Sequence, residues 1–123
     1  LEAIMPDRQI PVLASAIWLS IASSSVIAES QAEYAEKAHA SWQQQNQLME
    51  ESYSRLLSEA EAEPNKEPAQ QLKKAKEQWV EFRNLFCKSV SQTYGGQWQS
   101  VRESECRVNL ANQLKATTDT YGW

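Results

Sequence analysis

The side chains best suited to acid–base and nucleophilic chemistry are few and widely spaced. His39 is the only histidine, and Asp119 is the only aspartate after residue 28. A histidine-activated nucleophile needs a nearby hydroxyl or thiol and an orienting carboxylate, and the sequence offers no such set. Glu77 and Glu81 could imitate the carboxylate pair of a glycoside hydrolase, but carboxylates four residues apart on one helix are usually exposed. The sequence therefore predicts no catalytic residue and no enzyme.

The two cysteines form the clearest chemical pair. Cys87 lies eight residues before Gly95, and Cys106 lies ten residues after Gly96. In an antiparallel helical hairpin that turns at these glycines, positions equidistant from the turn stand at the same height, so the two sulfurs would lie side by side. We expect a Cys87–Cys106 disulfide, and the alternative is two free buried thiols. Oxidised cysteines leave His39 without further zinc ligands, so we expect no metal and no cofactor.

The first 28 residues differ sharply from the rest. Residues 10–22 are mostly apolar, Arg8 precedes them, and small residues lead to Ala28. This order is typical of a secretory signal peptide that is cut after Ala28. The alternative is an uncleaved membrane anchor, but the apolar run is shorter than the roughly 20 residues that a spanning helix needs.

Cleavage would leave a mature domain of residues 29–123. Met5 is a plausible native start, so residues 1–4 are expected to be foreign to the natural protein. We expect the mature domain to be periplasmic or secreted, and not to be stably inserted in a membrane. The formal net charge of −4 argues against nucleic acid and anionic membranes as main partners.

Helix-breaking residues divide the mature chain into three segments. Pro64 and Pro68 mark one break, and Gly95-Gly96 marks the other. The resulting helices are expected at residues 30–63, 67–94 and 97–121, and Ser30 with Glu33 would form a capping box at the first. Short connections favour an all-α fold, an antiparallel three-helix bundle with one disulfide between the second and third helices.

Each predicted helix carries an apolar stripe with 3-4 spacing, which we expect to form the core. The stripe of the first consists of Ala35, Ala38, Trp42, Gln45, Met49, Ser52 and Leu56. The stripe of the second consists of Leu72, Ala75, Trp79, Phe82, Phe86 and Ser89, flanked by Val90. The third is less regular, with Val101, Cys106, Leu110, Leu114 and Tyr121.

Two runs of residues resemble one known family. Trp79-Val80-Glu81-Phe82-Arg83-Asn84-Leu85-Phe86-Cys87 is similar to the Trp-x-x-Phe/Tyr-Arg-Asp/Asn-x-x-Cys signature of the LprI-like domain, which is named for a bacterial lysozyme inhibitor. Asn46 to Leu57 resembles the Asp-x-x-Leu-Asn-x-x-Tyr-x-x-Leu-Leu run of that family. The resemblance covers most of the mature chain.

The resemblance implies a protein partner, such as a lysozyme-type cell-wall hydrolase that this chain would inhibit. The alternative is a structural or adaptor protein of the envelope that binds another exported protein. An inhibitor needs an ordered element that protrudes into a cleft, whereas an adaptor would show an exposed apolar stripe on a helix.

Candidate contact residues lie in the two loops. At the first loop they are Glu59, Glu61, Glu63, Lys66 and Glu67, and at the second loop the candidate is Trp98. Residues of the family motifs are expected to be structural: Tyr53, Leu56, Trp79, Phe82, Arg83, Gly95 and Gly96. For Arg83 we expect a structural pair with a glutamate such as Glu50 or with a carbonyl, and the alternative is a carboxylate-binding role.

Overall fold

A computed structural model describes the backbone of residues 4–123 and the side chains of residues 30–123. The chain divides into two compact units, Leu1–Glu33 and Tyr34–Trp123. The predicted signal peptide, residues 1–28, lies outside the residues whose side chains are described. All contacts discussed below belong to the second unit.

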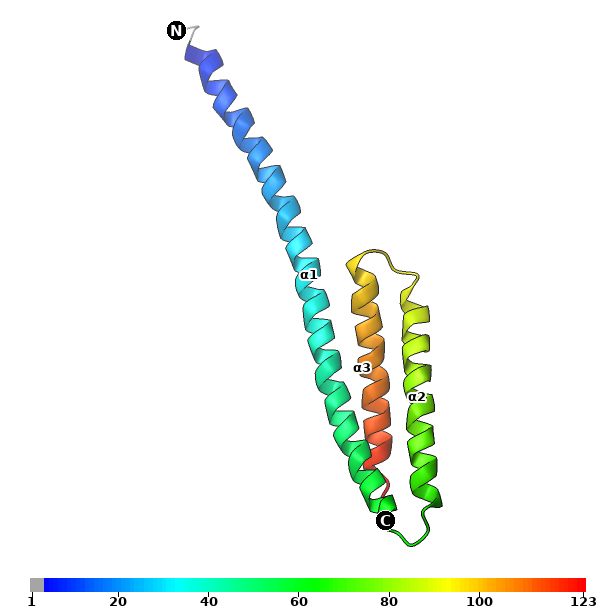
Figure 1. The fold of residues 1–123 in the computed structure, drawn as a ribbon. Coiled ribbons are helices and arrows are strands. Elements are labelled where there is room, and N and C mark those ends of the chain that lie inside the picture. The colour runs from blue at the N-terminus through cyan, green and yellow to red at the C-terminus, as the bar shows by residue number, and fades with distance from the viewer. Residues whose placement is uncertain (1–3) are drawn as a thin grey trace. The chain divides into compact units, whose positions relative to one another are not determined.

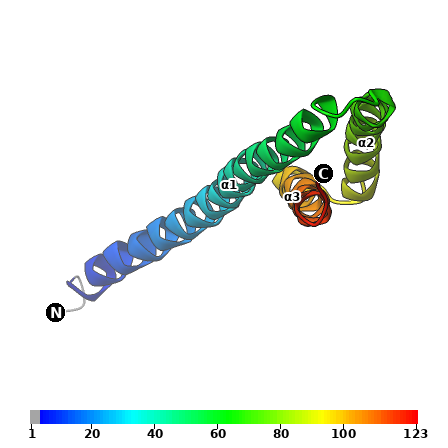
Figure 2. The same ribbon diagram turned by 90° about the horizontal axis from the view of Figure 1, so that it is seen from below.

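The described chain consists of three helices and contains no strand. They are α1 (Ile4–Glu61), α2 (Glu67–Ser91) and α3 (Gln97–Asp119). In Figure 1, α2 and α3 run antiparallel, and the last part of α1 lies along α3. Figure 2 shows the ends of the three helices around a common centre. The predicted all-α three-helix fold is confirmed.

The helices end where proline, asparagine and glycine interrupt them. Asn65 Oδ1 accepts a hydrogen bond from the backbone N–H of Glu67 at 3.0 Å, which satisfies one free donor at the start of α2. Pro68 follows in the first turn, where a missing N–H does no harm. Gly96 precedes α3 with φ 57°, a conformation that other residues rarely adopt.

The predicted start of the first helix is wrong for this chain. We expected a capping box at Ser30, but α1 begins at Ile4 and continues through that position. Ala, Glu and Gln dominate the sequence around residue 30, and no glycine or proline breaks it, so nothing stops the helix there. The starts of α2 and α3 agree with the prediction. All three helices end two or three residues before the predicted C-terminal ends.

The core is small and is built from all three helices. Trp42, Met49, Tyr53 and Ala111 are buried together, and four partly buried side chains pack against them: Leu72, Trp79, Val108 and Leu114. Leu56 extends the buried face of α1 as predicted, and Ala60 is buried one turn further along. Tyr53 also donates a hydrogen bond from its hydroxyl to the carbonyl of Leu72, which ties α1 to α2.

The predicted inner face of α2 is confirmed for Leu72 and Trp79, which pack against the core, and is wrong for the rest of the stripe. The buried residues of α2 are Ala69, Arg83, Cys87 and Ser91, whereas Phe82, Phe86 and Val90 are exposed. Ala75 and Ser89 of the predicted stripe are exposed as well. The reason is geometric: Cys87 must face α3 to reach Cys106, and Phe86 then lies about 100° away around the helix. The prediction that Tyr121 belongs to the core is also wrong. Tyr121 lies beyond the end of α3 and is exposed.

The disulfide lies where the glycine turn predicts it. Cys87 and Cys106 are bonded with their Cα atoms 5.5 Å apart, and no free cysteine is found in the chain. The bond links the last part of α2 to the middle of α3. Closing a loop of this size stabilises a protein by about 3 kcal/mol, which matters for so small a core.

Candidate functional site

Arg83, in the second family motif, is a buried residue with a structural role. Its exposed fraction is 7%. Its guanidinium donates hydrogen bonds to the side-chain oxygens of Asn46 at 3.1 Å and Asn84 at 2.9 Å. The expected pair with Glu50 is wrong, because the Glu50 carboxylate binds Lys76 instead.

Two tryptophans surround this guanidinium. The central carbon of Arg83 lies 4.5 Å from the ring centroid of Trp42 and 5.2 Å from that of Trp79, so both rings attract the cation. Burial lowers the pKa of Arg83, the Arg107 charge lowers it further, and Glu50 opposes them. The amide oxygens and the ring faces therefore hold the buried charge in place, which leaves the Arg83 side chain little access to a ligand.

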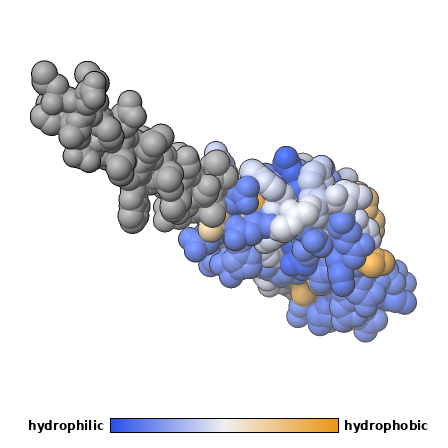
Figure 3. All heavy atoms as spheres, turned by 90° about the horizontal axis from the view of Figure 1, so that it is seen from above, coloured by the Kyte–Doolittle hydropathy of each residue, from blue (hydrophilic) through white to orange (hydrophobic). Residues whose placement is uncertain are grey.

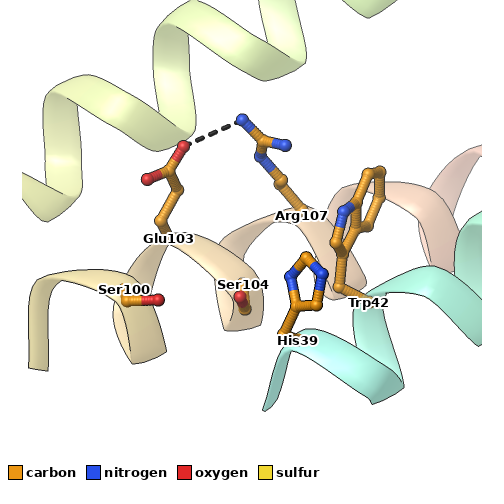
Figure 4. Close-up of a pocket in the computed structure, with 6 residues that line it drawn as sticks. All are labelled: His39, Trp42, Ser100, Glu103, Ser104 and Arg107. Carbon is orange, nitrogen blue, oxygen red and sulfur yellow. Dashed lines mark hydrogen bonds and ion pairs between the residues drawn. The ribbon is translucent and has the colours of Figure 1, made fainter. Parts of the chain in front are cut away.

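Arg107 of α3 stands beside a pocket that sequence reasoning did not find. The pocket has a volume of about 210 Å³ and is lined by residues of α1 and α3: His39, Trp42, Ser100, Glu103, Ser104 and Arg107. Figure 4 shows Glu103 and Arg107 at one side of it and His39 and Trp42 at the other. Arg107 binds Glu103 at 2.8 Å, and its Nε has no hydrogen-bond partner among the described residues.

The lining of this pocket is polar but already partly satisfied. Its one carboxylate, Glu103, is engaged by Arg107, so the lining lacks the two carboxylates on which glycoside hydrolysis usually depends. One ring face of Trp42 is close to Arg83 and another contact is made by Arg107 at 5.4 Å, which leaves little ring surface for stacking. Among the described residues, no three His, Cys, Asp or Glu side chains are grouped as a metal site requires.

The first predicted contact surface, the acidic end of the bundle, is less acidic than its sequence implies. Glu59 pairs with Arg55 at 2.8 Å, and Glu61 lies 4.0 Å from Lys73. Lys66 donates a hydrogen bond to the carbonyl of Glu61 at 2.6 Å. The two remaining members of the predicted set, Glu63 and Glu67, form no ion pair within residues 30–123. Basic side chains therefore compensate much of the local negative charge.

Arg55 also closes this end of the bundle. Its guanidinium donates to the carbonyls of Thr118 and Tyr121 at 3.0 and 3.1 Å, at the end of α3 and just beyond it. Ser52 donates to Asp119 beside it. This part of the first motif thus has a structural task that the sequence did not reveal.

The second predicted contact surface lies at the other end of α2 and α3 and is aromatic. We call it the aromatic tip and define it by four residues: Tyr34, Tyr94, Trp98 and Arg102. Their three rings have exposed fractions of 59%, 44% and 39%. The ring centroids of Tyr34 and Trp98 are 6.1 Å apart, and the Arg102 guanidinium lies 5.3 Å from the Tyr94 ring. The tip combines the residue types that most often dominate protein interfaces.

A third surface was missed because three of its four residues were assigned to the core. We call it the α2 stripe and define it by Phe82, Leu85, Phe86 and Val90, which are 52%, 70%, 44% and 43% exposed. The rings of Phe82 and Phe86 stack at 5.4 Å. In Figure 3, which views the molecule from above, hydrophobic residues emerge at a few places on a mostly hydrophilic surface.

The fold and these surfaces define a small all-α protein stapled by one disulfide. A sequence model of the family described as lysozyme inhibitor LprI matches residues 22–116 of the chain. Because this match covers most of the sequence, the protein belongs to the LprI family.

No individual curated protein and no solved structure matches the chain. Within the described part of the chain, we find no helix with the length and apolar character that a membrane crossing requires.

Proposed function

We propose that this protein is an exported inhibitor of a lysozyme-type cell-wall hydrolase and that the aromatic tip is its contact surface. Family membership supports the target class, because the family is described as lysozyme inhibitors. It also supports a binding role rather than catalysis. The disulfide supports export, since disulfides persist in oxidising compartments. Export would remove residues 1–28 as a signal peptide.

The single observation that carries the choice of surface is the exposed cluster of aromatic rings at one end of the bundle. An inhibitor must place an ordered element in the cleft of its target. The turn before α3 is short, and the disulfide and Gly96 hold the hairpin that presents it. Trp98 and Tyr34 support one another through ring contact, so less side-chain freedom would be lost on binding.

The acidic end ranks second as a contact surface. Many lysozyme-type hydrolases are basic, so negative charge would favour encounter with them. Arg55, Lys66 and Lys73 offset much of that charge, however. Exposed charges at the rim of an interface chiefly change the association rate, and salt screens them.

A cell-wall lysis assay tests this proposal with protein expressed from the full sequence. The wild type should slow lysis by at least one lysozyme type at micromolar concentration and low salt. Trp98→Ala should weaken inhibition by about tenfold or more, because a buried aromatic anchor contributes about 2 kcal/mol or more to binding. Trp123→Ala is the matched control, since Trp123 is also exposed but follows α3 at the opposite end.

The outcomes separate the surfaces as well as the functions. Equal inhibition by Trp98→Ala and wild type would remove the aromatic tip from the proposal. Loss of inhibition on replacing Glu59, Glu61, Glu63 and Glu67 together by Gln would transfer the contact to the acidic end. No slowing of any lysozyme type would refute inhibition itself.

An envelope adaptor is the second candidate, and the α2 stripe is the observation that favours it. Such an adaptor would bind another exported protein through a helix face, and the stripe is an exposed apolar face of that kind. Phe82→Ser should then abolish capture of an envelope protein while lysis assays remain unaffected. Capture that survives this substitution would argue against the adaptor function.

A further inference from the structure

The α2 stripe belongs to a longer surface that carries no charge. Five exposed residues continue it along the same side of α2, at helical spacing and without a charged group: Gln71, Ala75, Gln78, Ser89 and Thr93. The opposite side of α2 is occupied by its buried residues, including Arg83 and Cys87. This outward side is therefore available along most of the helix, and its four large apolar residues lie in the C-terminal half of α2.

We propose that the α2 stripe binds the α2 stripe of a second copy of this chain, with the two helices antiparallel. The charges along one edge of the stripe point to this partner. Glu81 and Lys88 are exposed on that edge, seven residues apart, and neither forms an ion pair within residues 30–123. A two-fold axis that passes between residues 84 and 85 places Glu81 opposite Lys88 of the second copy, and Lys88 opposite Glu81.

The same axis suits the apolar residues. Leu85, the most exposed large hydrophobic residue of the stripe, stands next to the axis and meets its own copy. Phe82 and Phe86 of each copy then surround the two leucines. A parallel pair would instead place the charged edges of the two copies on opposite sides of the interface, so Glu81 of one copy could not reach Lys88 of the other.

The two aromatic tips would lie on opposite sides of the two-fold axis. In this register Tyr94 of one copy stands level with residue 75 of the other. Self-association through the stripe does not depend on inhibition, and the two ideas can fail separately.

Analytical ultracentrifugation over a concentration series tests the proposal with protein expressed from the full sequence. The wild type should sediment as a dimer at high concentration and dissociate on dilution. Leu85→Glu should weaken dimerisation by more than about a hundredfold, because it places two carboxylates at the axis and removes two buried leucines. Gln70→Glu is the matched control on the charged side of α2 and should leave the dissociation constant unchanged.

Charge exchange tests the antiparallel register. Glu81→Lys alone and Lys88→Glu alone should each weaken dimerisation by about tenfold, since each creates two like-charge contacts. The double variant should restore wild-type dimerisation. Far-ultraviolet circular dichroism of every variant shows whether it is folded, and an unfolded Leu85→Glu protein leaves the charge-exchange series as the deciding measurement.

Three results would overturn the proposal. The first is a wild-type protein that stays monomeric over the whole concentration range. The second is a dimer that Leu85→Glu and the single charge changes leave intact, since another face must then form it. The third is a monomer that binds a different envelope protein in a way that Leu85→Glu abolishes, which would make the stripe a surface for that partner.

Discussion

Arg83 shows how one buried side chain organises the contact between helices. Its guanidinium contacts Asn46 and Trp42 of α1 while it remains attached to α2. A lysine could keep the charge but could not bind both amide oxygens or cover both rings. We expect Arg83→Lys to lower the free energy of unfolding by about 2 kcal/mol. Urea unfolding followed by tryptophan fluorescence measures this.

Arg102→Lys provides the matched control for that measurement, because Arg102 is exposed and its ion pair with Glu105 lies on the surface. Its effect should stay within about 0.5 kcal/mol. Equal effects of the two substitutions would show that the bonds of Arg83 add nothing to stability.

Asp119 supplies a second prediction at the residue scale, on pH. Hydrogen bonds from Lys115 and Ser52 lower the pKa of Asp119. A depressed pKa in the folded state means that this contribution is present above the ordinary aspartate pKa of about 3.9 and is lost as pH falls through the lower folded value. Asp119→Asn should therefore unfold with a weaker pH dependence below pH about 4. Stability curves of wild type and variant that fall equally steeply with pH in this range would disprove this.

Among the secondary-structure elements, the α2–α3 hairpin depends most on its covalent link. The disulfide joins the last part of α2 to the middle of α3, and the core that they share with α1 is small. Replacing Cys87 and Cys106 together by Ala should lower the free energy of unfolding by about 2–4 kcal/mol, because the unfolded chain regains the freedom that the bond removes. Urea midpoints with and without reductant give the comparison. A variant as stable as the oxidised wild type would show that packing alone holds the hairpin.

The helices could be predicted from sequence more completely than the directions in which they face. Prolines 64 and 68 and the glycine pair determine where two helices end, and the distance of Cys87 from that pair predicts its partner. For α2, however, Phe82 and Phe86 suggested one inner face, while Cys87 and Arg83 occupy the real one. A hydrophobic pattern cannot distinguish a core stripe from an interface stripe, because both are apolar with the same period.

The disulfide was the signal that could have decided between the two faces. Once the side chain of Cys87 is known to face α3, Arg83 and Ser91 must face the same way, because they lie four residues before and after it. Phe82 and Phe86 must then face away. The aromatic tip was only partly predictable, since Trp98 was expected at the surface but its contact with Tyr34 joins residues distant in sequence. The cluster of Arg83, Trp42 and Trp79 was not predictable for the same reason, because Trp42 is distant from the other two in sequence.

At the scale of the whole molecule, the contacts described for the bundle lie within one of its two units. The buried cluster of Trp42, Met49, Tyr53 and Ala111 lies entirely within Tyr34–Trp123, as do the ion pairs and the disulfide described above. A chain that begins at Glu29 keeps all of these contacts and loses only the beginning of α1. We therefore expect the uncut chain and a version produced directly from residue 29 to unfold at the same urea concentration.

Intact-mass measurement of the protein recovered after export identifies its first residue, which we expect to be Glu29. The folded domain then begins close to Ser30, a good N-cap for the shortened α1, with Glu33 three residues later. Ser30→Ala should lower the stability of the shortened protein by about 1 kcal/mol but have less effect in the uncut chain, where residue 30 is inside the helix. A mass that still includes residues 10–22 would contradict cleavage after Ala28. Equal effects of Ser30→Ala in the two forms would contradict the idea that cleavage determines where this helix begins.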